Sequence, residues 1–396
     1  MKRIILLLHV LSLYSFGFSQ CVTTEDANNT VSSCKFGGGI GTEDSRTSNT
    51  IVTQAQKWLS SIFTTVMEPA VKKTKGLRGA SGGRVGITKD DGLTPYEMYS
   101  YMQELGCTTS QKLYEKDESG VKILFKINSL SGIATAITHD EYVLVKKSYE
   151  KKEVFDKVNG RQVYLLEQPT ESERYAGFTY YRKEDNGDKN IVVAKDGIPL
   201  FLPVSIKDVL QIYRTILTVN MNQQNKQYTD IIDQGEEGYL AQMDLPAYEK
   251  NFGKEAAQKA KADYIKTYQQ YVEGSKKMIK DDPNKKWIST IDAYLNKSSA
   301  TQLARPCIVR TSENPGYNPI TDAQFFDEPF DGMQYVTINP AYSNIKDPTT
   351  PQFVIVNTAI NINAKSATTL TARKDFEDVI DFKKLAAILS NTQGKP

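Results

Sequence analysis

Apolar side chains recur at three- and four-residue steps early in the chain, and this period predicts a helix over residues 51–73. A glycine-rich turn is expected over residues 76–86. A second helix is expected next, because Thr94 can cap it, Glu97 completes a capping box and Gly106 can end it.

From residue 121 the apolar period changes to two, which predicts strands separated by short polar turns. The stretch Asp185–Asp188 has the composition of a hairpin turn. Consecutive strands with short connections form an antiparallel meander. We therefore predict an α+β fold in which N-terminal helices pack on an antiparallel sheet. The expected strands are 121–125, 142–145, 162–166, 175–181 and 191–194.

The second half of the chain reads as a helical insertion followed by later strands. Ser205 can cap a first helix, a polar stretch at 220–244 is expected to form a loop, and a long helix is expected over 246–280. Gly253 and Gly274 are expected to bend or break this long helix. Later strands are expected at 307–310, 333–338 and 353–358, before a last amphipathic helix. The pattern leaves open whether they join the first sheet.

The N-terminus has the features of a cleavable signal peptide. An apolar run follows Lys2 and Arg3, and it is too short for a membrane span, which takes about 20 apolar residues. Gly17 and Ser19 are small residues two apart, as a signal peptidase requires. We predict cleavage before Gln20 and no transmembrane span. The predicted divisions are a signal peptide (1–19), an irregular arm (20–50), helices with a meander (51–220), and a helical segment with C-terminal strands and helix (221–396).

Cys21 raises the alternative of a lipoprotein anchored through this residue. Gln20 fits such a signal poorly, because a small residue is required directly before the lipidated cysteine, so we favour a soluble secreted or periplasmic protein. Four cysteines in an exported chain favour two disulfides, with three possible connectivities. The expected pairs are Cys21–Cys34 and Cys107–Cys307.

Charge excludes one class of partner. The chain has 49 basic and 47 acidic residues, and loss of Lys2 and Arg3 with the signal peptide would make the two counts equal. A nucleic-acid-binding domain shows a clear basic excess, so no nucleic-acid partner is expected. The lysines between 276 and 286 are interpreted as a solvated helix face.

Two patterns contain residue types used in catalysis. Ser81 lies in Gly-Ala-Ser-Gly-Gly, which matches the G-x-S-x-G nucleophile pattern, yet that chemistry needs a strand-to-helix turn in an alternating α/β fold. We interpret this stretch as a flexible turn. His139 is the only histidine after the signal peptide, and one histidine cannot form a multi-histidine metal site. No cofactor and no metal are expected.

The acidic cluster of Asp327, Glu328 and Asp331 is the most site-like feature of the sequence. Paired carboxylates can carry out acid–base chemistry on a glycoside, and the neighbouring phenylalanines can stack on a sugar ring. We interpret the cluster as a solvated loop, because it lacks calcium-loop spacing, and keep a carboxylate-dependent glycan hydrolase as the alternative function. The chain also has 22 tyrosines, and tyrosine-rich surfaces favour protein or carbohydrate contacts.

Four short segments resemble parts of secreted proteins of the Bacteroidota that have no known activity. The segments are Phe18-Ser19-Gln20, Asp196–Val204, Asn339-Pro340-Ala341-Tyr342 and Pro351-Gln352-Phe353. The resemblance implies export and transfers no catalytic residue. Together these patterns favour an exported, non-catalytic binding or interaction protein whose partner is an envelope protein or a glycan.

Overall fold

The computed structural model divides the chain into two compact, discontinuous units. The sheet unit comprises Met1–Thr135, Leu166–Leu202 and Thr337–Pro396, and the helical unit comprises Ala136–Leu165 and Pro203–Val336. This division differs from the predicted boundary after residue 220, because late segments of the chain return to the first unit. The structure describes residues 23–42, 47–86, 93–116, 120–136, 157–166, 170–171, 179–183, 188–195, 198–309, 333–343, 347–360 and 367–390.

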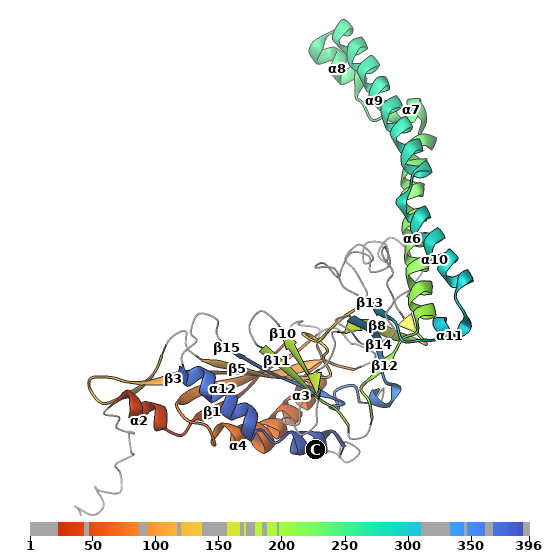
Figure 1. The fold of residues 1–396 in the computed structure, drawn as a ribbon. Coiled ribbons are helices and arrows are strands. Elements are labelled where there is room, and N and C mark those ends of the chain that lie inside the picture. Colours follow the sequence, from red (N-terminus) through yellow and green to blue (C-terminus); the bar gives the residue numbers. More distant parts are fainter. Residues whose placement is uncertain are drawn as a thin grey trace, which may run out of the picture. The chain divides into compact units, whose positions relative to one another are not determined.

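The sheet unit is built on a nine-stranded sheet of order β1-β2-β3-β5-β15-β11-β10-β9, with β4 paired to β3 (Figure 1). β1 is parallel to β2, and the other pairs are antiparallel. The strands are β1 (Ser33–Thr42), β2 (Leu77–Val85), β3 (Tyr96–Cys107), β4 (Leu113–Glu115), β5 (Val121–Ile127), β9 (Thr170–Glu171), β10 (Thr179–Lys183), β11 (Asp188–Val193) and β15 (Val354–Ile360). The predicted α+β fold is confirmed, and the late strand β15 completes the first sheet between β5 and β11.

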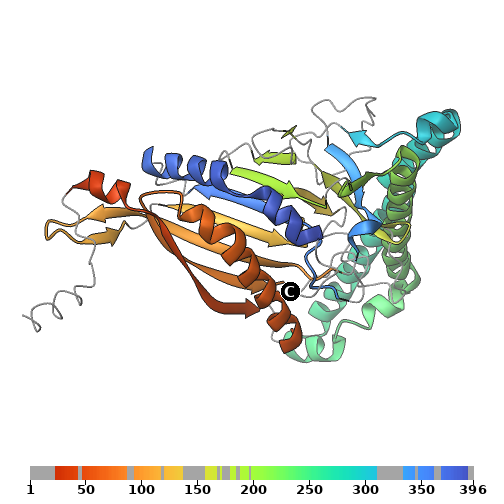
Figure 2. The same cartoon turned by 90° about the horizontal axis from the view of Figure 1, so that it is seen from below.

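Helices cover one face of this sheet, as the orange and blue helices of Figure 2 show. They are α3 (Asn49–Ile62), a π-helical segment (Phe63–Met67), α4 (Glu68–Val71), α12 (Ala367–Val379) and α13 (Phe382–Ser390). The Ser48 hydroxyl accepts a hydrogen bond from the Ile51 amide and so caps α3. Leu59, Phe125 and Phe376 lie in the shared apolar core. The amphipathic helices therefore form as the sequence predicts, with their apolar stripe on the sheet.

Three local predictions in the sheet unit are wrong. Residues 76–86 contain strand β2 rather than a turn, and residues 94–106 contain strand β3 rather than a helix. The arm at 20–50 contains a short helix, α2 (Thr24–Asn29), and the edge strand β1. Along β3 buried and more exposed side chains alternate, and this period of two outweighs the helix-capping residues at its start.

The helical unit contains a long helical hairpin and a second sheet. α6 packs against α10 and α9, while α7 and α8 pack against α9 (Figure 1). The predicted loop at 220–244 is therefore wrong over most of its length. Gly253, with φ of +88°, separates α8 from α9 and confirms the predicted break there, whereas α9 continues through Gly274. The helices are α6 (Ile206–Asp233), α7 (Gly235–Leu240), α8 (Leu245–Phe252), α9 (Lys254–Lys280), α10 (Pro283–Lys297) and α11 (Ala300–Leu303).

The second sheet has the order β12-β14-β8-β6, with β7 paired to β8 and β13 paired to β14. Each of the strands β6, β8, β12 and β14 contains one of the points at which the chain passes from one unit to the other. The strands are β6 (Ala134–Ala136), β7 (Lys157–Val158), β8 (Arg161–Leu166), β12 (Phe201–Pro203), β13 (Ile308–Val309) and β14 (Met333–Ile338). Among the described helices, none is both long enough and apolar enough to cross a membrane.

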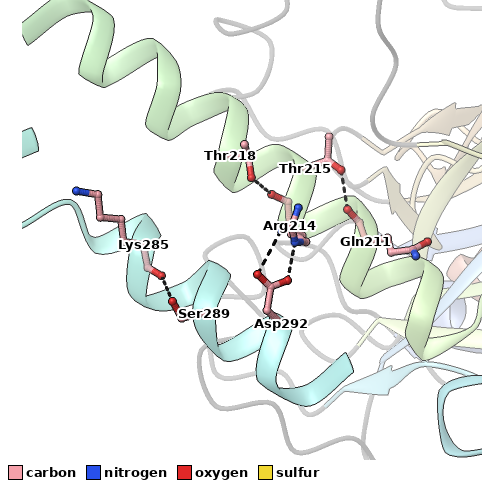
Figure 3. Close-up of polar contacts among 7 residues, drawn as sticks. All are labelled: Gln211, Arg214, Thr215, Thr218, Lys285, Ser289 and Asp292. Atoms are coloured by element: carbon pink, nitrogen blue, oxygen red, sulfur yellow. Dashed lines mark hydrogen bonds and ion pairs between the residues drawn. The ribbon is translucent and has the colours of Figure 1, made fainter. Parts of the chain in front are cut away.

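An ion pair joins two helices of the hairpin. Arg214 of α6 donates two hydrogen bonds to Asp292 of α10, at 2.6 Å and 3.2 Å (Figure 3). These hydrogen bonds and the charge of Asp292 raise the pKa of Arg214. Thr215, Thr218 and Ser289 instead bond to carbonyl groups of their own helices. Among the contacts in Figure 3, the Arg214–Asp292 pair is thus the one that joins α6 to α10.

Candidate functional site

The second face of the large sheet carries the strongest candidate binding surface. On β3 the side chains of Tyr96, Met98, Ser100 and Met102 are buried on the helix-covered side. Because side chains alternate along a strand, Glu97, Tyr99, Tyr101 and Gln103 lie on the opposite side. We call this surface, formed by strands β1, β2, β3 and β5, the tyrosine face.

The hydroxyl end of the Tyr99 ring lies over the neighbouring strand. It is paired with Gly82 of β2, and a Cβ atom added to Gly82 would lie 2.6 Å from the Tyr99 hydroxyl and 2.7 Å from ring atom Cζ. The glycine therefore leaves the space that the ring occupies. Tyr99 remains 43% exposed, so part of this side chain is available to a ligand.

Tyr101 lies in the middle of a row that crosses four strands. The register pairs Lys35 with Ala80, Ala80 with Tyr101, and Tyr101 with Lys122. Paired strands lie about 4.8 Å apart, so Lys122 is adjacent to Tyr101, and the small Ala80 separates it from Lys35. Tyr101 is 40% exposed. The next row of the face carries Arg78 opposite Gln103.

The tyrosine face is basic. Lys35 and Lys122 are exposed and Arg78 is half-buried, and none of the three forms an ion pair within the described structure. Arg84 binds Glu97 at 2.9 Å on the far side of Tyr99. Unpaired cations beside exposed aromatic rings can bind an anionic group while the rings bind an apolar surface.

A loop covers the neighbouring part of this face. Leu130 and Ile133 are 3% exposed, and the Lys126 ammonium donates to the Ser131 carbonyl at 2.7 Å. The Asn190 amide donates to the Gly132 carbonyl at 3.3 Å. The loop thus fixes one border of the tyrosine face.

Ser81 is not placed for nucleophilic catalysis. It lies within β2, is 4% exposed, and its hydroxyl lies 2.5 Å from the Ser100 hydroxyl and 3.1 Å from the Cys34 sulfur. The G-x-S-x-G pattern requires an exposed serine on a strand-to-helix turn. Ser81 is instead part of a buried polar row, and the predicted flexible turn is a strand. His139 lies outside the described residues.

The predicted disulfide pairs are wrong. Cys34 and Cys307 are free thiols buried in different units. Burial raises the pKa of both. Cys107 is disulfide-bonded, and the remaining cysteine of the sequence, Cys21, lies outside the described residues. The spacing of cysteines along the sequence could not predict that Cys34 is a buried free thiol, because the register of β1 on β2 sets its position.

The other predicted site residues have mixed outcomes. Asp327, Glu328 and Asp331 lie outside the described residues, so their role as a hydrolase site stays a prediction. The described residues contain no group of three or more His, Cys, Asp or Glu side chains that could hold a metal ion. The lysines between 276 and 286 are exposed on α9 and α10, which confirms the solvated helix face.

Described parts of three of the segments that carry the sequence resemblance lie together in the sheet unit. The Tyr342 hydroxyl donates to the Ile198 carbonyl at 2.5 Å and accepts from the Lys195 amide at 3.0 Å. The Lys195 ammonium donates to the Gln352 amide oxygen at 2.6 Å. Burial lowers the pKa of Lys195. Since each polar group already has protein partners, we interpret this cluster as a structural clamp.

Sequence reasoning did not single out Tyr99 and Tyr101. The available signal was the alternation of residues 96–103, which reads as a strand with its odd positions on one face. The helix-capping residues at the start of this stretch favour a helix instead, and they outweigh the alternation in a reading of the sequence alone. No protein-family model, no curated protein and no solved structure matches this chain.

Proposed function

We propose that this chain is an exported, non-catalytic glycan-binding protein that holds its ligand on the tyrosine face. The observation that carries the proposal is the pair of exposed rings at Tyr99 and Tyr101. Their Cα atoms are two residues apart on one strand, about 7 Å. The C–H face of a sugar ring is apolar and packs on an aromatic ring, while its hydroxyl groups bind polar side chains at the border.

The geometry of Tyr99 supports a preformed platform. Its ring rests on Gly82, so binding costs little loss of side-chain freedom. Glu97 and Gln103 lie on the same strand and the same face as the two tyrosines, where they can accept and donate hydrogen bonds to hydroxyl groups.

The test compares the wild-type chain with Tyr99→Ala/Tyr101→Ala on a panel of soluble polysaccharides by affinity gel electrophoresis. Each stacked ring contributes roughly 1 kcal/mol, so the double variant should bind about 10- to 30-fold more weakly. Tyr114→Ala is the matched control: Tyr114 is 45% exposed and also lies against a glycine, Gly106, but on β4.

The control should retain wild-type affinity, because Gly106 is about 17 Å along β3 from Tyr101. Failure of the wild-type chain to bind any polysaccharide on the panel would end the proposal. Equal loss in the control and the double variant would show that the tyrosine face is not the ligand surface.

The same polysaccharide panel also tests the alternative function, a carboxylate-dependent glycan hydrolase. Release of reducing ends by the wild-type chain, lost in Glu328→Gln, would replace a non-catalytic function with hydrolysis. Binding without release of reducing ends would support the proposal.

A further inference from the structure

The charged residues of the tyrosine face are almost all basic. At the positions paired across β1, β2, β3 and β5 they are Lys35, Arg78, Arg84, Lys122 and Lys126, against Glu97 alone. The whole chain is nearly balanced, with 49 basic and 47 acidic residues. The basic excess is therefore a local property of this face.

Three of these cations are available to a ligand. Arg84 is paired with Glu97, and Lys126 bonds to the Ser131 carbonyl. Lys35, Arg78 and Lys122 have no ion-pair partner within the described structure and surround Tyr101 on both sides. An anion between them would neutralise like charges that otherwise repel each other.

We infer that the ligand is an anionic polysaccharide whose sugar rings stack on Tyr99 and Tyr101 while its carboxylate or sulfate groups bind Lys35, Arg78 and Lys122. This inference rests on the proposed function. Arg78 can bind either anion through two parallel N–H groups, and the lysines act as point charges. The side chain of Ala80 is too short to fill the space between Lys35 and Tyr101, which leaves room for the anionic substituent.

Single-stranded nucleic acid is the competing ligand, because it also combines stacking with basic side chains. The near-neutral chain and the signal-like N-terminus favour the glycan. An oligonucleotide therefore belongs in the test as a competitor.

The experiment measures binding of the full chain to polygalacturonate, dextran sulfate, unmodified dextran and a 15-residue oligothymidylate by isothermal titration calorimetry at low and high salt. We expect polygalacturonate or dextran sulfate to bind more than 10-fold tighter than dextran, with the preference lost at high salt. The preferred polymer identifies the anion as carboxylate or sulfate. Tyr101→Ala should weaken binding of that polymer at least fivefold, which a purely ionic attraction would not show.

The variant Lys35→Gln/Arg78→Gln/Lys122→Gln should lose the anionic preference at least 10-fold. The control Lys57→Gln/Lys112→Gln/Lys383→Gln makes a similar change of charge at exposed lysines outside the face and should retain it. Circular dichroism checks the fold of each variant. If the triple variant does not fold, Lys122→Gln alone, at an exposed position, should reduce the preference at least twofold.

The outcomes separate the two proposals. Equal or tighter binding of dextran overturns the anionic inference and leaves the proposed function standing. Binding of the oligonucleotide in preference to every polysaccharide overturns this inference. Binding of none of the polysaccharides overturns the proposed function, and the anionic inference with it.

Discussion

The two units bury apolar side chains in different ways. In the sheet unit one continuous core joins helices α3, α4, α12 and α13 to six strands of the large sheet. In the helical unit the core extends along α6 only as far as Leu217 and along α10 to Ile291, and it contains no residue of α7, α8 or α9. Most of the hairpin therefore forms without a comparable core.

Tyrosine rings and amide side chains take the place of that core in the far part of the hairpin. The ring of Tyr239 in α7 lies 4.6 Å from that of Tyr264 and 5.1 Å from that of Tyr268. Buried amide oxygens of Asn220 and Gln223 on α6 have no hydrogen-bond partner in the described structure. Since unpaired buried polar atoms destabilise a fold, the comparison predicts that the hairpin opens locally before the sheet unit unfolds.

Truncation of the sheet-unit core should have the largest effect. Phe125 lies on β5 in the middle of the sheet and is 0% exposed. We expect Phe125→Ala to lower the free energy of unfolding by about 3–5 kcal/mol, because a large buried side chain is lost and a cavity remains. Chemical denaturation followed by circular dichroism measures this change. A loss below about 1 kcal/mol would contradict the view that this core holds the unit together.

The hairpin should respond locally to the loss of its tyrosine stack. We expect Tyr239→Ala to destabilise the far part of the hairpin by about 1–2 kcal/mol through lost ring contacts. Native-state hydrogen exchange should show faster exchange over residues 220–280, with the large sheet unchanged. Equal acceleration in both units would show that they unfold together, which would break the comparison.

The clamp at Tyr342 should make the stability of the sheet unit depend on pH in the alkaline range. Burial raises the pKa of Tyr342 from 10.0 to about 12. The folded state thus holds this proton more tightly, and its contribution to stability is complete below pH 10 and is lost as the pH rises from 10 to about 12.

Tyr342→Phe removes both the titration and the hydroxyl hydrogen bonds. We expect a loss of about 1 kcal/mol at neutral pH, because the partly buried Lys195 amide and Ile198 carbonyl lose a hydrogen-bond partner. Thermal melting between pH 9 and 12 should show a shallower decline in the variant than in the wild-type chain. An unchanged slope would assign the alkaline loss to the other buried tyrosines.

The ion pair of the hairpin should have the smallest effect. Arg214 and Asp292 are 46% and 38% exposed in their side chains. Because exposed pairs are screened by solvent, Arg214→Ala should cost less than about 1 kcal/mol. A double-mutant cycle with Asp292→Ala measures the pair itself, and a coupling energy well above that value would mean that the two helices depend on it.

The sequence predicted the parts of the fold in which local pattern and packing agree. The helix after residue 51 and the strand after Val121 were expected, since their apolar period matches their buried faces. Strand β2 was missed because its glycines act through tertiary contacts: Gly79 lies beneath the Tyr101 carbonyl and Gly82 beneath the Tyr99 ring. A local reading takes the same glycines as a turn.

The candidate surface was missed for a related reason. Lys35, Ala80, Tyr101 and Lys122 form one row only through the register of four strands, and the sequence around Lys35 predicts an irregular arm. Only the general expectation of a tyrosine-rich binding surface could be stated from composition. Pairing register is a property of the folded sheet, and no single segment encodes it.

The alkylation rate of each free thiol reports how often its own unit opens. Cys34 is 8% exposed in the sheet unit, and Cys307 is 0% exposed in the helical unit. Burial keeps both protonated at neutral pH, so an alkylating reagent reacts only after the surrounding structure opens. The two alkylation rates, separated by peptide mapping, would therefore time the opening of each unit in one unmodified sample.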